Sequence, residues 1–167
     1  RTTNGKVYAC GFNRNGRLGI SDQRCAATRA TRTQDGDYIV EGVLRLREGS
    51  TSTVVLTMVD GSRKRWLVGG EVREEWLLLE PRGDQGLGGE PPRNLQIDGR
   101  SYTLTRRGQS SVAGVGRHGR PDGTRLGTYL YQADSRHVLW LERWGKDVLV
   151  GAGERIDGNM VGFLPGS

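Results

Sequence analysis

Asn-Gly and Asp-Gly dipeptides recur along this chain of 167 residues, and they constrain its fold more than any other feature. They occur at residues 4–5, 15–16, 35–36, 60–61, 98–99, 122–123 and 157–158. Asn or Asp followed by Gly tolerates the positive φ angles of two-residue β-hairpin turns. Most of these dipeptides separate runs that are rich in β-branched and aromatic residues, as strands are. The sequence therefore predicts an antiparallel, turn-rich β fold.

The runs between the turns predict eight strands. In the run 37–47, apolar residues such as Val40 and Leu44 alternate with charged residues such as Arg45, as expected for a half-buried strand. Residues 70–79 fit a short helix or a further strand, and the pattern leaves both open. The predicted strands span residues 6–10, 37–47, 51–59, 64–68, 101–106, 127–132, 138–143 and 147–150.

Two parts of the chain share one order of features, which indicates an internal duplication. In each part an Asp-Gly turn leads to a tyrosine strand, then a hairpin, then a strand with adjacent tryptophan and leucine. The first part contains Tyr38 and Trp66, and the second contains Tyr102 and Trp140. A Gly-rich loop over residues 114–123 accounts for the greater length of the second part.

These observations predict an all-β fold of two similar antiparallel β lobes, each barrel-like or sandwich-like, with few or no helices. Three of the five prolines lie in the segment between the two parts, which is therefore a predicted linker. The predicted division is a basic N-terminal hairpin segment (1–34), a first β lobe (35–80), a Gly/Pro linker (81–93) and a second β lobe (94–167).

The positive charge of the chain is concentrated at its N-terminal end. The formal net charge is +6, and residues 1–34 alone contain seven basic residues and one acidic residue. Such a segment attracts nucleic acid or an anionic surface by releasing counterions. An ordinary solvated surface is the other interpretation, because arginine replaces lysine throughout the chain.

Composition indicates a cytoplasmic protein with no transmembrane segment. No apolar run is longer than four residues, as at residues 76–79, which is far shorter than a membrane-spanning helix. Cys10 and Cys25 do not form a disulfide framework, so two reduced thiols and a single bridge both remain open. His118 and His137 have no cysteine or acidic residue at metal-ligand spacing, so we expect no metal and no cofactor.

No catalytic constellation is recognisable, and three functions remain as hypotheses. The leading one is a non-catalytic module that binds a protein partner. The alternatives are binding of nucleic acid or an anionic surface through the basic segment and the arginine-rich loop, and an enzyme that acts on a small polar or cationic substrate. The candidate binding residues are Arg117, His118, Arg120, Arg125, Glu71, Glu75 and Glu142.

The order of several short motifs resembles a known family. These motifs are residues 38–46, 65–68, 98–102, 107–108, 139–145 and 162–166. Together they are similar to the bacterial family called domain of unknown function 4178, over about residues 35–166. The resemblance implies a cytoplasmic β domain without an established catalytic residue, often encoded beside membrane-associated stress proteins and polyamine-synthesis enzymes.

Overall fold

The structure is a computed structural model that describes residues 7–11, 37–70 and 75–163, and it consists of β-strands. The predicted all-β class is therefore confirmed. Of the helix and the strand that remained open for residues 70–79, the described residues form a strand, β5, which begins at Glu75. The elements are β1 (Val7–Gly11), β2 (Asp37–Glu48), β3 (Thr51–Asp60), β4 (Arg63–Gly70), β5 (Glu75–Arg82), β6 (Asn94–Ile97), β7 (Arg100–Gly116), β8 (Arg125–Gln132), β9 (His137–Trp144), β10 (Asp147–Asp157), a short 3₁₀ turn (Gly158–Met160) and β11 (Val161–Phe163).

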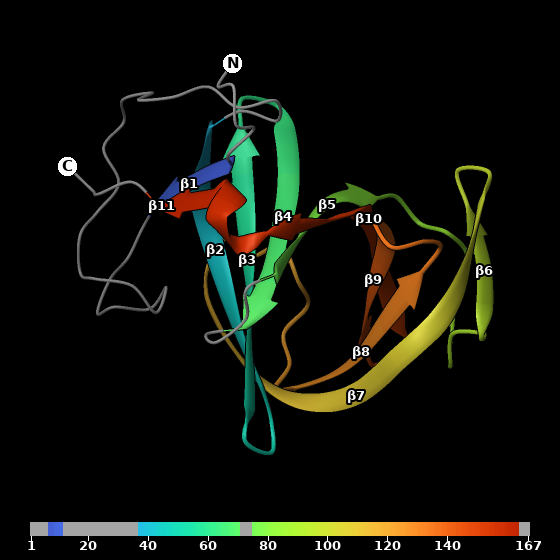
Figure 1. The fold of residues 1–167 in the computed structure, drawn as a ribbon. Helices are drawn as coiled ribbons and strands as arrows, with labels where there is room; N and C mark the ends of the chain where they lie inside the picture. Colours follow the sequence, from blue (N-terminus) through green and yellow to red (C-terminus); the bar gives the residue numbers. More distant parts are fainter. Residues whose placement is uncertain (1–6, 12–36, 71–74, 164–167) are drawn as a thin grey trace.

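Eight antiparallel strands close into a barrel (Figure 1). Their order is β2-β3-β4-β5-β10-β9-β8-β7, and β7 pairs with β2 to complete the ring. The strands form one barrel with a shared interior, in place of the two similar β lobes that the sequence led us to expect. Closure leaves no unpaired edge among these eight strands. Outside the ring, β1 and β11 extend the sheet from β2, and β6 pairs with β7.

The two predicted parts of the chain each supply four consecutive strands, and their pairing registers match. Both β2 and β7 carry a bulge at the same place, three residues after Tyr38 and Tyr102 respectively. Beyond the bulge Gly42 faces Thr57, while in the other part Arg106 faces Leu130. The match continues across all four strands of each part.

The seam between β5 and β10 obeys the same relation. Leu79 faces Gly153 and Pro81 faces Gly151, so each pair is the other with the two strands exchanged. Matching registers and this seam together describe an approximate twofold relation between the two sets of four strands. Because neighbouring strands at the seam are antiparallel, the relation exchanges the two ends of the barrel.

Apolar side chains from both parts of the chain fill the barrel interior. Burial of such side chains provides the main driving force for closing the sheet. Gly151 is required on this inner face, because a Cβ atom there would lie 2.6 Å from the ring of Trp66. The buried interior cluster comprises Leu44, Leu46, Val55, Trp66, Val68, Leu77, Leu79, Leu126, Val138, Trp140 and Trp144.

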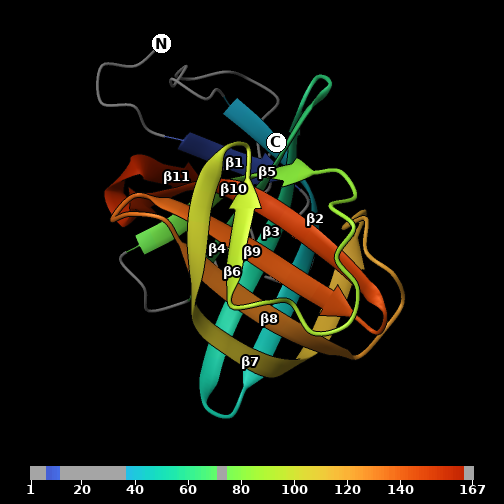
Figure 2. The same ribbon diagram turned by 90° about the vertical axis from the view of Figure 1, so that its right-hand side faces the viewer.

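Residues 83–93, together with β6, lie against the outer face of β8, β9 and β10 (Figure 2). The hydroxyl of Tyr131 donates a hydrogen bond to the carbonyl oxygen of Pro92 at 2.5 Å, and the hydroxyl of Tyr129 donates one to Glu90 at 2.9 Å. We call residues 83–93 the strap. The strap joins the two sets of strands and also covers apolar surface that would otherwise face water.

Candidate functional site

The connection between β7 and β8, residues 117–124, closes one end of the barrel, and we call it the plug loop. Two backbone hydrogen bonds hold its base: Arg117 donates to the carbonyl of Glu41, and Val112 donates to the carbonyl of Thr124, both at 2.9 Å. From this base the loop places the side chain of Arg120 inside the barrel, where 1% of it is exposed.

Arg120 forms a bidentate ion pair with Glu142, whose side chain is fully buried on β9. Arg120 Nε lies 2.8 Å from Glu142 Oε1, and Nη2 lies 2.9 Å from Oε2. Nη1 donates to Thr57 Oγ1 at 2.8 Å and also to the carbonyl of His118. The guanidinium carbon lies 4.2 Å from the ring centroid of Trp66. Such desolvated cation–π contact adds to the charge pairing.

Two indoles complete the coordination of the buried carboxylate. Trp140 Nε1 donates to one oxygen of Glu142 at 2.9 Å, and Trp144 Nε1 donates to the other at 3.0 Å. Burial alone would raise the pKa of Glu142, but the Arg120 guanidinium and these hydrogen bonds outweigh it and hold that pKa below its usual value. Glu142 is therefore a structural anion and is not available as a general acid or base near neutral pH.

His118 is held between glycines at the mouth of the same end. A Cβ atom on Gly42 would lie 2.5 Å from the His118 backbone nitrogen, and one on Gly114 would lie 2.7 Å from its imidazole. The imidazole Nδ1 accepts a hydrogen bond from the backbone N–H of Arg120 at 3.2 Å. Burial and the neighbouring Arg120 charge lower the pKa of His118, so the ring is neutral at pH 7.

Among the residues predicted from the sequence, the structure brings together Arg120, His118 and Glu142 and separates the others. Arg117 and Arg125 are exposed but Arg120 is buried, so the loop presents fewer exposed arginines than the sequence suggested. Glu75 lies exposed on β5 with Arg155 3.3 Å away. Glu71 lies outside the described residues, as do most of the basic N-terminal segment and both cysteine side chains.

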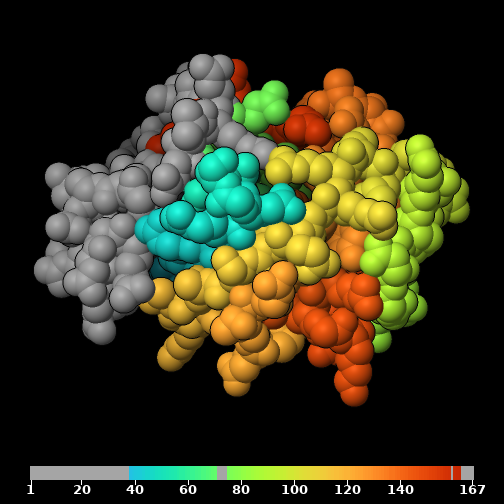
Figure 3. Space-filling view, turned by 90° about the horizontal axis from the view of Figure 1, so that it is seen from below, coloured from blue at the N-terminus to red at the C-terminus, as the bar shows by residue number. Residues whose placement is uncertain are grey.

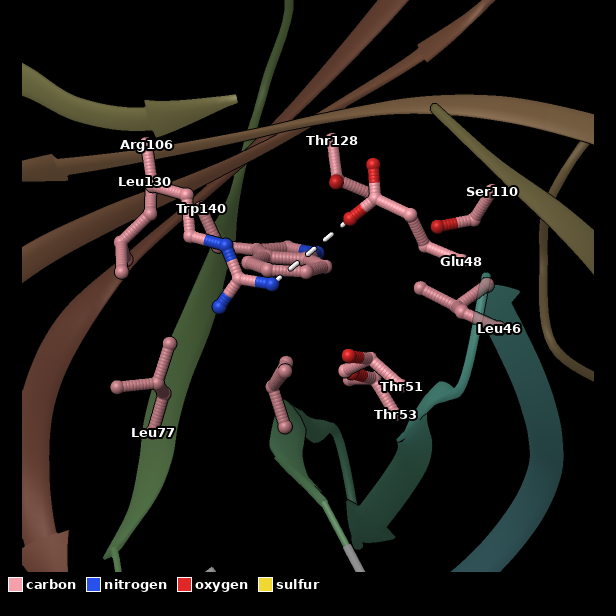
Figure 4. A pocket seen from close by; sticks show the side chains of 11 residues that line it. Leu46, Glu48, Thr51, Thr53, Leu77, Arg106, Ser110, Thr128, Leu130 and Trp140 are labelled. Carbon is pink, nitrogen blue, oxygen red and sulfur yellow. Dashed lines mark ion pairs between the residues drawn. The ribbon is translucent and has the colours of Figure 1, made fainter. Parts of the chain in front are cut away.

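The opposite end of the barrel is open and contains a narrow pocket, which sequence reasoning missed. The end lies beside the β2–β3 turn, drawn in cyan next to the yellow β7 in Figure 3. Its enclosed volume is about 30 Å³, room for about two groups the size of water or a methyl. Its apolar walls are Leu46, Val68, Leu77, Leu130 and the ring of Trp140; its polar residues are Glu48, Thr51, Thr53, Arg106, Ser110 and Thr128 (Figure 4).

The polar groups of this pocket divide into a weak ion pair and a set of unused hydroxyls. Arg106 lies 3.8 Å from Glu48, which also accepts the backbone N–H of Gln109 at 3.0 Å. Within the described part of the chain, no hydrogen bond is formed by the four hydroxyls, which belong to Thr51, Thr53, Ser110 and Thr128. Hydroxyls without partners beside an apolar wall are typical of a binding pocket. Alternation of inward-facing threonines along β3 is the sequence signal that could have indicated it.

The described residues show neither a metal cluster nor a membrane-spanning helix. No group of three or more His, Cys, Asp or Glu side chains that could hold a metal occurs there. The same residues include no helix long and apolar enough to cross a membrane.

Comparison with known proteins identifies a family whose function is not defined. No curated protein and no solved structure matches the chain. A family model does match, over residues 31–158, which includes every strand of the barrel. The chain therefore belongs to the family described as domain of unknown function 4178.

Proposed function

We propose that this protein is a non-catalytic interaction module that binds a loop of a protein partner at the open end of its barrel. The observation that carries the proposal is the pocket at that end, where an apolar wall meets four hydroxyls without hydrogen-bond partners among the described residues. The pocket is too narrow for a whole metabolite, because small-molecule sites usually enclose several hundred Å³. A side chain presented by a partner's loop fits the available space.

The positions of the candidate acidic residues also favour a binding function over an enzymatic one. Glu142 is already paired with Arg120 and accepts hydrogen bonds from two indoles, while Glu75 lies exposed on another strand. General acid–base catalysis requires such groups to converge on one cleft. Binding is therefore the function that this arrangement serves best.

The test uses matched substitutions on neighbouring residues of β7. Ser110→Phe should fill the pocket, because Ser110 is buried and lines it, whereas Ser111→Phe changes an exposed residue beside it. A partner is first isolated from the native host and purified, and its affinity for the variants is then measured by calorimetry. We expect Ser110→Phe to weaken binding at least tenfold and Ser111→Phe to leave it within twofold. A partner that binds Ser110→Phe as tightly as the unaltered protein would contradict the proposal.

We also propose that the two sets of four strands arose by internal duplication. Support comes from the bulges after Tyr38 and Tyr102, from the matching ladders and from the symmetric seam between β5 and β10. Trp66 and Trp140, which the sequence marked as equivalent, stand opposite the matching residues Thr57 and Leu130. Chance similarity of two β segments would not reproduce the register of every ladder.

A further inference from the structure

The two ends of the barrel are built from corresponding positions. Trp66 faces Thr57 near the plug loop, and Trp140 faces Leu130 near the pocket. The two tryptophans therefore correspond, and so do Thr57 and Leu130. At the closed end the ring of Trp66 and the hydroxyl of Thr57 both contact the inserted guanidinium. At the open end the two counterparts line the pocket.

The third contact of the guanidinium also has a counterpart. Val68 faces Leu77 between β4 and β5, while Glu142 faces Leu149 between β9 and β10, so Val68 and Glu142 correspond. Val68 lines the pocket, whereas Glu142 binds Arg120. Each side chain that contacts the guanidinium of Arg120 at the closed end therefore has a positional counterpart that lines the pocket.

The loops at the two ends differ, and this difference leaves the pocket free. At the closed end the plug loop, residues 117–124, inserts an arginine. At the open end the corresponding connection between β2 and β3 is only Gly49 and Ser50, which are both exposed and do not line the pocket. The pocket is thus the position that an inserted side chain would occupy if the turn between β2 and β3 were as long as the plug loop.

We infer that the open end receives an uncharged, branched aliphatic side chain at the tip of a partner's loop, in the manner in which the closed end receives Arg120. This inference rests on the proposed function and adds the chemistry of the partner. The tryptophan platform is kept at both ends, but the hydroxyl of Thr57 and the carboxylate of Glu142 are replaced by Leu130 and Val68. A charge buried beside Leu130 and Val68 would lack the carboxylate and the hydroxyl that Arg120 has at the closed end, and the Glu48 carboxylate of the pocket is already paired with Arg106.

The rim of the pocket suits the backbone of such a loop. Glu48, the carboxylate among the described lining residues, already faces Arg106 and the N–H of Gln109, so it does not demand a cation. The hydroxyls of the exposed Thr51 and the half-buried Thr128 can donate to carbonyls and accept from N–H groups of an inserted segment. The enclosed 30 Å³ holds about two methyl-sized groups, which matches the end of a leucine or valine side chain.

The test uses the full-length protein and three disulfide-cyclised peptides with the sequence of residues 117–123, carrying leucine, arginine or glutamate at the place of Arg120. Binding is followed through the methyl NMR signals of Val68, Leu77 and Leu130, with Leu126 at the closed end as the internal control. We expect the leucine peptide to shift the three pocket signals and to bind at least tenfold more tightly than the arginine peptide.

Two substitutions give the pocket the polar residue types that surround Arg120 at the closed end. Val68→Glu places a carboxylate where the closed end has Glu142, and should turn the preference toward the arginine peptide. Because Val68 is buried and its replacement can impair folding, Leu130→Thr provides a milder second variant that copies Thr57 and should shift the ratio of affinities in the same direction.

The outcomes separate this inference from the proposed function. If the arginine or glutamate peptide binds the unaltered protein as tightly as the leucine peptide, the inference about the tip is overturned while binding at the open end stands. If no peptide moves the pocket signals at millimolar concentration, the inserted-loop inference is also overturned. The proposed function is then judged by the separate comparison of Ser110→Phe with Ser111→Phe.

Discussion

At the scale of single residues, the buried pair of Arg120 and Glu142 dominates the closed end. Removing one partner of a buried pair leaves an uncompensated charge and costs about 3–5 kcal/mol, whereas removing both costs much less. Arg120→Met should therefore lower the free energy of unfolding by about that amount. Arg120→Met combined with Glu142→Gln should be more stable than Arg120→Met alone. Urea denaturation measures all three proteins.

The exposed Arg117 provides the control for this comparison. Arg117→Met changes the same kind of side chain in the same loop and should alter stability by less than about 0.5 kcal/mol. Equal effects of Arg117→Met and Arg120→Met would show that the buried pair does not stabilise the barrel.

His118 makes stability depend on pH. Its pKa is lowered in the folded protein by burial and by Arg120, so on acidification the unfolded chain, with an ordinary pKa of about 6.5, takes up the proton first. Stability present above pH 6.5 is therefore lost as the pH falls through the folded value.

We expect His118→Asn to flatten this dependence between pH 7.5 and 5.5, because the amide oxygen replaces the Nδ1 acceptor and does not titrate there. Urea denaturation at the two pH values provides the measurement. His137→Asn, which changes a surface imidazole beside Asp134, should leave the dependence due to His118 in place. A steep loss of stability that persists unchanged in His118→Asn would contradict the assignment.

At the scale of elements, the strap is held by hydrogen bonds from two buried tyrosines, Tyr129 and Tyr131, and by exposed ion pairs. Tyr131 is fully buried, and this burial raises its pKa to about 12. Tyr131→Phe leaves the Pro92 carbonyl without its donor and should cost about 1 kcal/mol. Glu90→Gln should cost less, because the ion pairs of Glu90 with Arg107 and Arg143 are exposed to solvent.

Hydrogen exchange provides the measurement for the strap. Faster amide exchange is expected across β6 in Tyr131→Phe, and little change in Glu90→Gln. The reverse order of effects would mean that the surface ion pairs, and not the buried hydroxyl, fasten the strap to the barrel.

Most strands could be predicted from the sequence, because they depend on local signals. Period-two alternation and Asp-Gly turns located β2, β3, β8 and β9 to within a few residues. β7 was predicted to end at residue 106 but continues to Gly116, because its glycine-rich half is held by pairing with β2 and not by its own propensity. Strand β6 was missed because its four residues are stabilised as a strand by pairing with β7 and by packing on apolar surface, and not by a local sequence pattern.

The site was harder to predict than the strands. Arg120 and Glu142 were both recognised as candidates, but separately, as groups available to a ligand. Their pairing depends on a loop that folds inward across the barrel, and no spacing in the sequence encodes that contact. The pocket escaped detection for a similar reason, because its residues come from seven strands that meet only when the ring is closed.

At the scale of the whole molecule, one shared interior predicts one unfolding transition. Leu44, Leu77 and Val138 belong to the same buried cluster although they come from both sets of strands. Thermal unfolding should therefore give coincident curves by tryptophan fluorescence, near-ultraviolet circular dichroism and exchange of the Leu67 and Leu141 amides. Two separated transitions, one for each half of the chain, would contradict a single cooperative barrel.

The inequality of the two barrel ends has a consequence for the history of the molecule. Two identical chains related by a twofold axis would form a barrel with identical ends, so a longer loop would close both ends or neither. Under the proposed duplication, joining two copies in one polypeptide removes that constraint, since a change in one copy no longer recurs in the other. On this proposal, the closed end and the open end of the barrel became free to differ in structure and in role once the two copies were fused.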